Sequence, residues 1–524
     1  MIKYFFLVAS FFISEFASSQ SYFSKRFEYG QPGWWDGASC ILQLSDGYIL
    51  NGAYQYYSPH CVGFCKFDLL GNKVFAKTIC DDTTEYFSGE PGSIIALTTD
   101  SIIAVGTSLT PTTNWEHDQG VIYFLNSQMD TLALKKYGET SFPYDTAYLF
   151  AQVKVDPDRN LIITGLHYPN TSNGRASMLL MKADTKGNLI WKKHYGTGLH
   201  YEGKSVICTS DGGYAIGGYG YGIPLPPDFS GDPVLIKTDS AGNQQWMLNM
   251  GSILVDTKAM ICNSMDGNII VGTTYCDSMP GSGPIAVGNP YRRINLLKVD
   301  NNGNILWNKK YGLSTVYNEL QNIRENSDGS LVACGMTTRF YTYTIDYAGW
   351  IFKTNQDGDS LWYREYVVCD GKTSWNWLWD VLQTKDNGFI AGGNVYVHPP
   401  DTGSHDGWIL KVDSLGCENP SYCWVGINQE RDLPVVERLT IFPIPASSTI
   451  QVAIVNIKPD FPVYLTLVDL FGNKVKEVLI PSVETSIRID ISAIPDGLYL
   501  VIARSGNQII ARSKLLINKK ATGL

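Results

Sequence analysis

The chain has little of the hydrophobic patterning that helices need. Within its 524 residues, nothing beyond the N-terminal 19 shows apolar residues at i, i+3, i+4 and i+7 over a helical length. Nor does any later segment approach the 18 consecutive apolar residues that a membrane-spanning helix requires. These two absences indicate an all-β protein without a membrane span.

The signatures of common catalytic and metal sites are missing as well. There is no Gly-x-Ser-x-Gly elbow, no His-Glu-x-x-His pair and no Cys-x-x-Cys pair with a matching partner. Seven histidines are scattered along the chain, and the net charge of -9 opposes binding to nucleic acid. We therefore expect no cofactor and no nucleic-acid partner.

The 11 cysteines suit an exported protein, although an odd number cannot all pair within one chain. Two pairs flank short loops, and these are the predicted disulfides: Cys61 with Cys65, and Cys417 with Cys423.

What the chain does have is one pattern repeated seven times. Each copy holds a strand, an Asp-Gly turn, a second strand, a run of the form apolar-apolar-Lys-x-Asp, a Gly-Asn turn and a segment like Trp-x-Lys-Lys-Tyr-Gly. Copies recur every 55 to 61 residues, anchored at Asp68, Asn126, Asp184, Asp239, Asp300, Asn355 and Asp413. A repeat of this kind, with several strands per unit, is typical of propeller blades.

Each copy contains four short β-like runs, as at 205–209, 214–219, 234–238 and 244–250. Four-stranded units in radial array predict a seven-bladed β-propeller over 20–427. The seventh copy lacks its fourth strand, while residues 23–29 read like 189–195 of the third copy. We expect this N-terminal strand to complete the last blade and close the ring.

The two ends of the chain carry transport signals. Residues 1–19 have the form of a secretory signal peptide, with Lys3, an apolar run and small residues before position 20. After a polar linker at 428–437, residues 438–519 form several β runs with turn signals between them, which predicts a small Ig-like β-sandwich. Residues 520–524 remain as a short tail.

This C-terminal region resembles the type A C-terminal sorting domain of the type IX secretion system. The similarity lies in the motifs at 441–447, 468–475, 490–492, 495–501 and 514–517, although Ile444 stands where the family usually has Asn. The residues that carry the motifs are Pro443, Pro445, Gly472, Gly497, Tyr499 and Lys514. The resemblance implies export through the type IX machinery and either attachment to the outer-membrane surface or release; an ordinary Ig-like adhesive domain is the alternative.

Propeller geometry divides the connections into two sets. The turns after the first and third strands of each copy are short and share one face, whereas those after the second and fourth strands are long and variable and share the other, called here the long-loop face. Aromatic residues concentrate in these long loops, where binding sites on rigid scaffolds are usual. The predicted ligand-binding residues are Trp34, Trp35, Tyr56, Trp115, Tyr144, Tyr168, Tyr221, Tyr341, Trp375 and Trp377.

Acidic residues recur 12 or 13 positions before the residue that follows the Asp-Gly turn, at Asp36, Glu202, Asp256 and Glu319. One interpretation is a ring of carboxylates that holds a divalent cation. The other is that each carboxylate accepts backbone hydrogen bonds from its neighbours, and the broken register in other copies favours this one.

Three functions remain open. The aromatic loops favour a non-catalytic protein that binds a surface glycan or another protein. A propeller-type glycoside hydrolase or polysaccharide lyase on the long-loop face is the main alternative. A quinone-dependent dehydrogenase is the third, from a faint Gly-Asn-x-x-x-Trp similarity, and the blade count opposes it.

Overall fold

The computed structural model divides the chain into two compact units, the first ending at Gly426 and the second beginning at Ile427. The described residues are 22–30, 35–55, 60–110, 118–138, 147–169, 175–196, 200–221, 231–251, 256–278, 291–312, 316–341, 344–368, 374–398, 405–418, 438–443, 446–455, 463–469, 474–480, 486–505 and 508–519. Every named element in these ranges is a β-strand. The predicted signal peptide, linker and C-terminal tail lie outside them.

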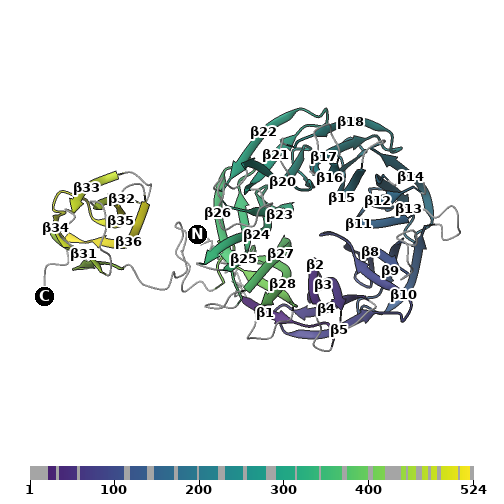
Figure 1. The fold of residues 1–524 in the computed structure, drawn as a ribbon, viewed down its shortest axis with the longest axis horizontal. Helices are drawn as coiled ribbons and strands as arrows, with labels where there is room; N and C mark the ends of the chain where they lie inside the picture. The colour runs from purple at the N-terminus through teal and green to yellow at the C-terminus, as the bar shows by residue number, and fades with distance from the viewer. Residues whose placement is uncertain are drawn as a thin grey trace, which may run out of the picture. The chain divides into compact units, whose positions relative to one another are not determined.

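The strands of the first unit form the seven blades of a β-propeller, which confirms the predicted fold (Figure 1). We number the blades along the chain. Blade 1 contains β2 (Trp35–Gln43), β3 (Gly47–Gln55), β4 (Cys61–Asp68) and β5 (Lys73–Ile79). Blade 2 contains β6 (Glu85–Ser88), β7 (Ile94–Thr98), β8 (Ser101–Leu109), β9 (Gln119–Leu125) and β10 (Thr131–Tyr137). Blade 3 contains β11 (Ala147–Val155), β12 (Leu161–Tyr168), β13 (Ser177–Ala183) and β14 (Leu189–Tyr195).

The later blades follow the same order. Blade 4 contains β15 (His200–Cys208), β16 (Tyr214–Tyr221), β17 (Gly231–Thr238) and β18 (Gln244–Asn249). Blade 5 contains β19 (Met260–Asn263), β20 (Ile269–Ser278), β21 (Tyr291–Val299) and β22 (Ile305–Tyr311). Blade 6 contains β23 (Asn318–Glu325), β24 (Leu331–Tyr341), β25 (Thr344–Thr354) and β26 (Ser360–Tyr366). Blade 7 contains β27 (Ser374–Gln383), β28 (Phe389–Val397), β29 (His405–Val412) and β1 (Phe23–Phe27).

The first strand of the chain therefore lies in the last blade. β1 pairs antiparallel with β29, in register from Phe23 with Lys411 to Phe27 with Gly407. Lys25 Nζ also donates to Asn72 Oδ1 of blade 1 at 3.2 Å, as Lys135 of blade 2 donates to Asn188 of blade 3 at 2.8 Å. In both pairing and contacts, β1 thus occupies the place of an outermost strand in a ring whose ends meet.

In six of the seven blades, an aspartate at or just before the first turn forms an ion pair with the lysine of the Lys-x-Asp segment. In blade 4 the Lys237 ammonium is fully buried and lies 2.8 Å from the carboxylate of Asp211. Burying an ammonium without a partner is costly, so the two repeated residues are needed together. In blade 2, where Phe124 occupies the lysine position, no such lysine is present. The pairs are Lys66–Asp46, Lys182–Asp156, Lys237–Asp211, Lys298–Asp266, Lys353–Asp328 and Lys411–Asp386, at 2.5 to 3.6 Å.

The Gly-Asn and Lys-Lys-Tyr-Gly segments join one blade to the next. Tyr195 in the outermost strand of blade 3 donates its hydroxyl hydrogen bond to the carbonyl of Gly242 in blade 4, at 2.7 Å. That glycine has a φ of 78°, a left-handed conformation that glycine adopts without steric cost. Corresponding bonds run from Tyr137 to Gly187, Tyr311 to Gly358 and Tyr366 to Gly416. The repeated residues are thus the ones that hold the ring together.

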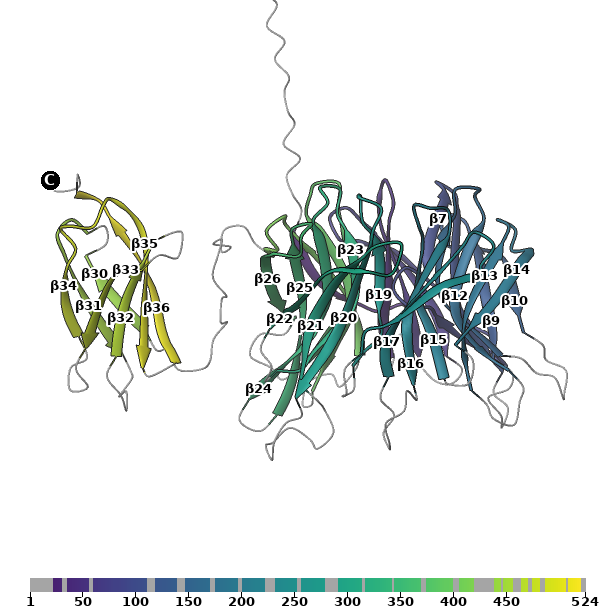
Figure 2. The same ribbon diagram turned by 90° about the horizontal axis from the view of Figure 1, so that it is seen from above.

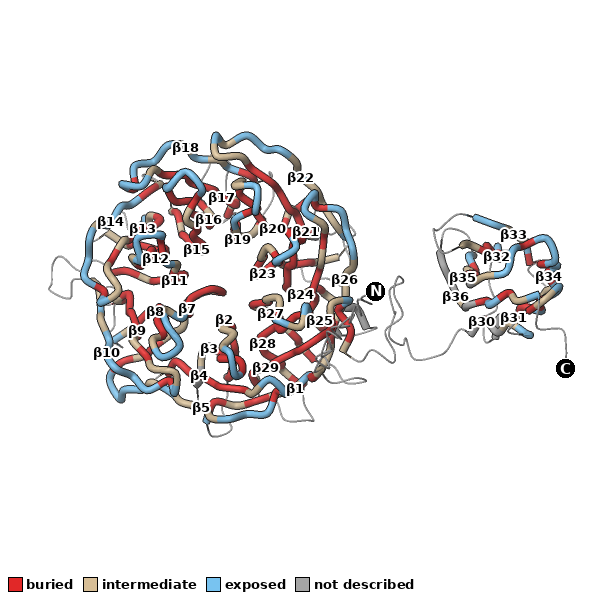
Figure 3. The backbone as a smooth tube through the Cα atoms, turned by 180° about the vertical axis from the view of Figure 1, so that it is seen from behind, coloured by how far each residue is buried: buried red, intermediate tan, exposed pale blue. Residues whose placement is uncertain are grey.

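Burial decreases from the middle strands of each blade to its outermost strand (Figure 3). The middle strands of each blade are almost wholly buried, as in β12, where seven consecutive residues are buried. The outermost strands alternate exposed charged residues with partly buried rings, as in β14 and β22. The core is therefore a set of clusters between neighbouring blades, and the innermost strands are placed by packing on both sides.

The second unit consists of two antiparallel sheets (Figure 2). One contains β30 (Arg438–Phe442), β31 (Thr449–Val455) and β34 (Ser486–Asp490). The other contains β33 (Lys474–Ile480), β32 (Val463–Val468), β35 (Gly497–Ser505) and β36 (Gln508–Ile517). Side chains of both sheets, including Val452, Leu465 and Leu515, form a single hydrophobic cluster, so this unit has a core of its own.

Candidate functional site

The innermost strands surround the propeller axis, and five of them share a β-bulge. The register shifts between Ala38 and Cys40 in blade 1, and at the same place in blades 3, 4, 6 and 7. We call the extra residue position 0; it is Ser39, Ala151, Lys204, Gln321 or Trp379. Residues at positions -1 and +2, such as Leu320 and Ile323, are buried within the sheets. Positions -2, 0 and +3 therefore face the axis.

In three blades, the residue at position +1 ties the blade to the next one. Its side chain accepts a hydrogen bond from the backbone N–H at position +2 of the neighbouring blade. These bonds run from Val206 N to Gln152 Oε1 at 2.7 Å, from Ile261 N to Ser205 Oγ at 2.8 Å and from Ile41 N to Asp380 Oδ2 at 3.0 Å. The bulge thus turns a polar side chain toward the adjacent blade, and it fixes where the axis-facing side chains lie.

Asp380 is the most heavily used of these acceptors. It is fully buried and also accepts hydrogen bonds from Arg324 and from the amide of Asn322, the latter at 2.6 Å. Arg324 Nη2 lies 2.9 Å from both oxygens of the carboxylate. A buried carboxylate is stable only when its charge and lone pairs are matched, and here both are.

At the long-loop end of the inner strands, charges from three blades meet. The segment between β6 and β7 bends toward the axis and carries Glu90 (Figures 1 and 3). Its carboxylate lies 3.0 Å from Lys204 Nζ of blade 4 and 2.6 Å from Lys258 Nζ of blade 5. Lys204 also lies 3.2 Å from Glu202, which contacts His200 Nε2 at 2.8 Å. We call these five residues the axial charge cluster.

Electrostatics keep both carboxylates of this cluster ionised. Burial by itself raises the pKa of Glu90, but Lys258 and Lys204 outweigh burial and hold that pKa well below its ordinary value. For Glu202 burial is likewise opposed, by the hydrogen bond from His200 and the charge of Lys204, and the pKa falls to about 2. Neither group therefore holds a proton near neutral pH.

On the other side of the axis, aromatic rings gather at the long-loop end of blades 6 and 7. The centroid of Trp375 lies 5.6 Å from that of Trp377 and 5.9 Å from that of Tyr347. Trp375 is also 5.4 Å from Tyr396, and Tyr396 stacks on His405 at 4.4 Å. Burial, the largest effect, lowers the pKa of His405 to about 4, so this ring is neutral at pH 7. We call these five residues the aromatic cluster; all are partly exposed.

Polar groups lie beside these rings at the same depth. Glu319 occupies position -2 of blade 6, as Trp377 does in blade 7. Its carboxylate accepts hydrogen bonds from the Tyr317 hydroxyl at 2.5 Å and from Gln321 Nε2 at 3.0 Å. Glu319 is partly exposed, whereas Gln321 is buried, so the long-loop end combines flat rings with an accessible carboxylate.

Of the ten predicted ligand-binding residues, the structure brings Trp375 and Trp377 together in the aromatic cluster. Tyr168 lies elsewhere, with its ring 5.9 Å from that of His200 in the axial charge cluster. The strands fix the backbone of three others, but their side chains lie outside the described residues: Trp35, Tyr221 and Tyr341. The remaining four lie wholly outside the described residues: Trp34, Tyr56, Trp115 and Tyr144.

The four acidic residues that the less favoured interpretation placed in a cation-binding ring are not brought together. Glu202 and Glu319 lie at position -2, facing the axis. Asp36 is one position earlier, is fully buried, and burial raises its pKa to about 7. Asp256 is buried too, and its carboxylate accepts the N–H of Cys276 at 2.6 Å. Because neighbouring residues of a strand point to opposite sides, a shift of one position separates the two pairs.

A metal site receives no further support from the geometry. Among the described residues, no three His, Cys, Asp or Glu side chains are grouped so that they could hold a metal ion. None of the described segments forms a helix long and apolar enough to span a membrane.

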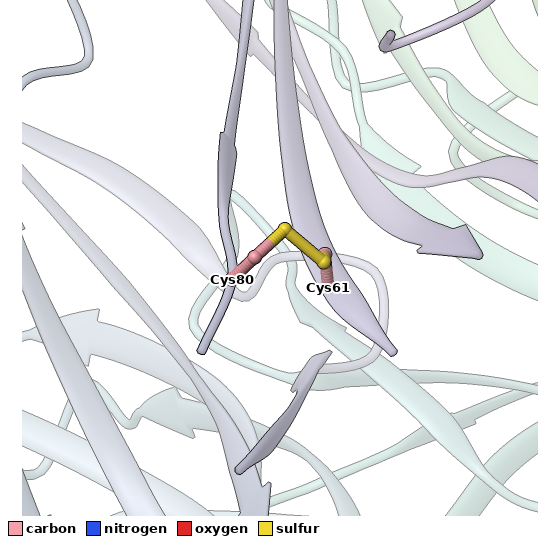
Figure 4. Close-up of a disulfide and its surroundings, with 2 residues drawn as sticks. All are labelled: Cys61 and Cys80. Carbon is pink, nitrogen blue, oxygen red and sulfur yellow. A yellow bond between two sulfur atoms is a disulfide. The ribbon is translucent and has the colours of Figure 1, made fainter. Parts of the chain in front are cut away.

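The predicted disulfide between Cys61 and Cys65 is wrong. Cys61 bonds to Cys80 at the end of β5, with their Cα atoms 4.8 Å apart (Figure 4). Cys65 is a buried free thiol on the same strand as Cys61. Four residues of extended chain span about 13 Å, whereas a disulfide needs Cα atoms within about 7 Å. Cys417 is disulfide-bonded, but Cys423 lies outside the described residues, so that pairing stays a prediction.

The C-terminal motif residues occupy structured positions where they are described. Tyr499 is buried in the core of the second unit and donates a hydrogen bond to the carbonyl of Pro495 at 2.9 Å. Gly497 begins β35, the backbone of Lys514 pairs with Leu500, and Pro443 is exposed after β30. Pro445 and Gly472 lie outside the described residues.

Comparison with known families decides the role of this unit. Residues 440–518 match the family described as the secretion system C-terminal sorting domain. The chain ends in a type IX sorting domain. The protein is therefore exported to the cell surface or the extracellular space, and its second unit is what the secretion machinery recognises.

The chain is similar to a curated protein of distant relationship. The chain is 24% identical over 273 residues to the regulatory protein FlaEY of Caulobacter vibrioides, which is 48% of this chain but 27% of that protein. The aligned region thus spans about a quarter of the relative's length.

Solved structures similar to the chain share little sequence with it. Polysaccharide lyase Uly1 gives a TM-score of 0.43 at 9% identity, covering 76% of this chain and 95% of that one. The periplasmic gluconolactonase PpgL of Pseudomonas aeruginosa gives 0.40 at 11% identity, covering 70% and 96%. Similarity at this level carries no argument about activity.

Sequence reasoning missed the axial charge cluster. Glu90 belongs to the one copy whose inner strand is interrupted, and Lys204 and Lys258 look like ordinary surface lysines in the sequence. The sequence offered one signal: Lys204 lies close to an acidic residue in the predicted inner strand of the fourth copy, whereas a solvated lysine is expected in a surface turn. What the sequence could not indicate was that blades 2, 4 and 5 meet at the axis.

Proposed function

We propose that the protein is a binding protein displayed or released outside the cell, and that the long-loop end of its inner strands holds a saccharide. The observation that carries this proposal is the aromatic cluster with the Glu319 carboxylate beside it. Flat rings such as Trp375 and Trp377 offer rigid area for the C–H face of a sugar ring. The Glu319 carboxylate at the same depth can accept hydrogen bonds from its hydroxyl groups.

Binding to a glycan array with the exported full-length chain tests this proposal. We expect selective binding to one class of glycan, and a loss of at least about tenfold in affinity for Trp377→Ala, since removing a ring that anchors a ligand costs about 2 kcal/mol. Glu319→Gln keeps the size of the side chain and tests the polar side of the site separately. Tyr464→Ala is the control, because Tyr464 is an exposed ring in the second unit.

The proposal fails if the wild-type protein binds no glycan, or if Trp377→Ala and Glu319→Gln both bind as the wild-type protein does. Binding to a protein partner that survives both substitutions would place recognition elsewhere on the long-loop face.

A polysaccharide lyase is the second candidate, and the axial charge cluster is the observation that favours it. His200 lies 2.8 Å from Glu202 and near the Tyr168 ring, which is the arrangement of a positioned base. A two-carboxylate hydrolase is less compatible with this cluster, because the lowered pKa values of Glu90 and Glu202 leave neither group as a proton donor.

Incubation with uronic-acid polysaccharides separates the two candidates. Under the binding proposal no unsaturated product accumulates, as read by ultraviolet absorbance. Product formation that is lost in His200→Ala but retained in Trp377→Ala would favour the lyase instead.

A further inference from the structure

The opposite, short-turn end of the inner strands contains a cavity that the proposed function does not use. Its volume is about 200 Å³. Blades 3 to 6 supply its walls, with residues that immediately precede the short turns. The polar and thiol groups that line it are Gln152, Lys154, Cys208, Cys262, Asn322 and Arg324.

Lys154 and Arg324 face each other in this cavity. Both occupy position +3 after the bulge, in blades 3 and 6, so they lie at the same depth. At this position the other blades with an aligned register carry Leu42, Ile207, Cys262 and Leu382. Two cations therefore share one level with aliphatic and thiol side chains and with no carboxylate.

Both cations have hydrogen-bond donors that the protein leaves unused. Arg324 donates hydrogen bonds from Nε and Nη2 to Asp380, and among the described residues its Nη1 donates to nothing. Lys154 Nζ likewise has no hydrogen-bond or ion-pair partner among the described residues, although six lysines of the repeat are each paired with an aspartate. The unused hydrogen-bond donors of Arg324 and Lys154 thus border the same cavity.

The nearby carboxylates neutralise only one of these two cations, Arg324. Asp380 is saturated by Arg324, Asn322 and two backbone N–H groups. Glu325, one residue after Arg324, accepts hydrogen bonds from Ser264 Oγ at 3.2 Å and Met265 N at 2.9 Å. Burial, and then the charge of Arg324, lowers the pKa of Lys154. The folded protein therefore bears a cost for charging Lys154 here, and an anion would offset it.

We propose that this cavity binds a small oxyanion, a phosphate, sulfate or carboxylate group, between Lys154 Nζ and Arg324 Nη1. Charge-assisted hydrogen bonds to oxyanions are the strong ones, and guanidinium and ammonium groups together are the usual donors. The volume accommodates a free inorganic anion or the anionic end of a small molecule. The site is at the opposite end of the inner strands from the saccharide site, so either one can be absent without the other.

Titration calorimetry on the exported full-length chain tests the site, with sodium sulfate and then sodium phosphate added at constant ionic strength in a chloride buffer. We expect saturable binding of one anion per chain. Lys154→Met should weaken it at least about tenfold, because a charged hydrogen bond contributes about 1.5–3 kcal/mol. Lys186→Met is the matched control, since Lys186 lies in an exposed turn of the same blade and removes the same charge.

Lys154→Gln provides a second variant with a polar side chain, in case the apolar one alters packing. A sulfate ester of a monosaccharide, titrated in parallel, separates the two sources of the anion: tighter binding than sulfate indicates an anionic group on a larger molecule, and weaker binding indicates the free ion. The proposal is overturned if neither anion binds the wild-type chain saturably, or if both Lys154 variants bind as tightly as Lys186→Met.

Discussion

The two ends of the inner strands present charge in opposite ways. At the long-loop end, Lys204 and Lys258 are each paired with Glu90, and the groups neutralise one another across the axis. At the short-turn end, Lys154 and Arg324 lie at one level, each with an unused hydrogen-bond donor, and a cavity lies between them. Both arrangements are built on the same bulged strand.

The difference shows how the propeller separates scaffold from site. Bulge register decides which side chains face the axis, and it is common to five blades. The identity of the residue at each axis-facing position then varies from blade to blade. A charge at such a position has its effect through blades that are distant in sequence, as Glu90 does with Lys258.

The largest expected effect concerns Asp380, the buried partner of Arg324 at the short-turn end. Asp380→Ala removes the partner of Arg324 and the acceptor for Ile41 N, and should lower the free energy of unfolding by about 4 kcal/mol, because an uncompensated buried charge remains. Chemical denaturation of the full-length chain measures this. Asp359→Ala is the control, since Asp359 pairs with Lys309 at the surface, where solvent screens the pair, and should change stability far less. An Asp380→Ala loss below about 1 kcal/mol would contradict this account.

Replacing Lys204 at the long-loop end and replacing Lys154 at the short-turn end should change the free energy of unfolding in opposite directions. Lys204→Met leaves Glu90 and Glu202 with fewer partners, so the free energy of unfolding should fall by about 2 kcal/mol; the groups are partly solvated, which keeps the loss below that of a fully buried pair. Denaturation of Lys204→Met beside Lys309→Met, whose lysine is at the surface, isolates the contribution of the axial charge cluster. Equal stability of these two variants would show that the cluster is not stabilising.

The axial charge cluster should also make stability depend on pH in the acid range. The pKa of Glu90 is lowered in the folded protein, so its contribution is present above its ordinary pKa of 4.5 and is lost as pH falls below that value. Glu202, with a pKa of about 2, acts in the same direction. Between pH 6 and about pH 2, the midpoint temperature of thermal unfolding should therefore fall more steeply for the wild-type chain than for Glu90→Gln. Parallel curves would exclude the ion pairs as the cause.

The smallest effect is expected at the short-turn end. In a chloride buffer, Lys154→Met should leave the free energy of unfolding unchanged or raise it by up to about 1 kcal/mol, because a desolvated ammonium without a partner is replaced by an apolar chain. Addition of sulfate should then stabilise the wild-type chain and not the variant. A loss of stability in chloride similar to that of Lys204→Met would remove the contrast between the two ends.

Much of the fold was accessible from the sequence because the repeat itself encodes it. The spacing of the anchors indicated seven units, and Asp-Gly and Gly-Asn marked the turns. What the repeat did not reveal was why lysine and aspartate recur together: the Lys237–Asp211 pair is formed across a blade by residues 26 positions apart. Its partners become visible only when the strands are placed side by side.

The candidate site was much less accessible. Trp375 and Trp377 were found because aromatic residues in long loops are conspicuous. Cys61 was paired with the nearer cysteine in sequence, whereas its partner is on the adjacent strand. Asp36 was placed with Glu202, although one residue of register turns their side chains in opposite directions.

By itself the sequence determined the all-β class, the blade number and the export route, because each is written in local patterns: strand length, turn residues and the motifs of the sorting domain. Only the tertiary structure decided which charges meet at the axis, since that depends on bulge register and on blades far apart in the chain. The long-loop end contains a closed network of ion pairs, and the short-turn end contains a cavity between two cations. Both arise because ring closure brings residues that are distant in the chain to one axis. The local sequence sets only the direction in which each side chain points.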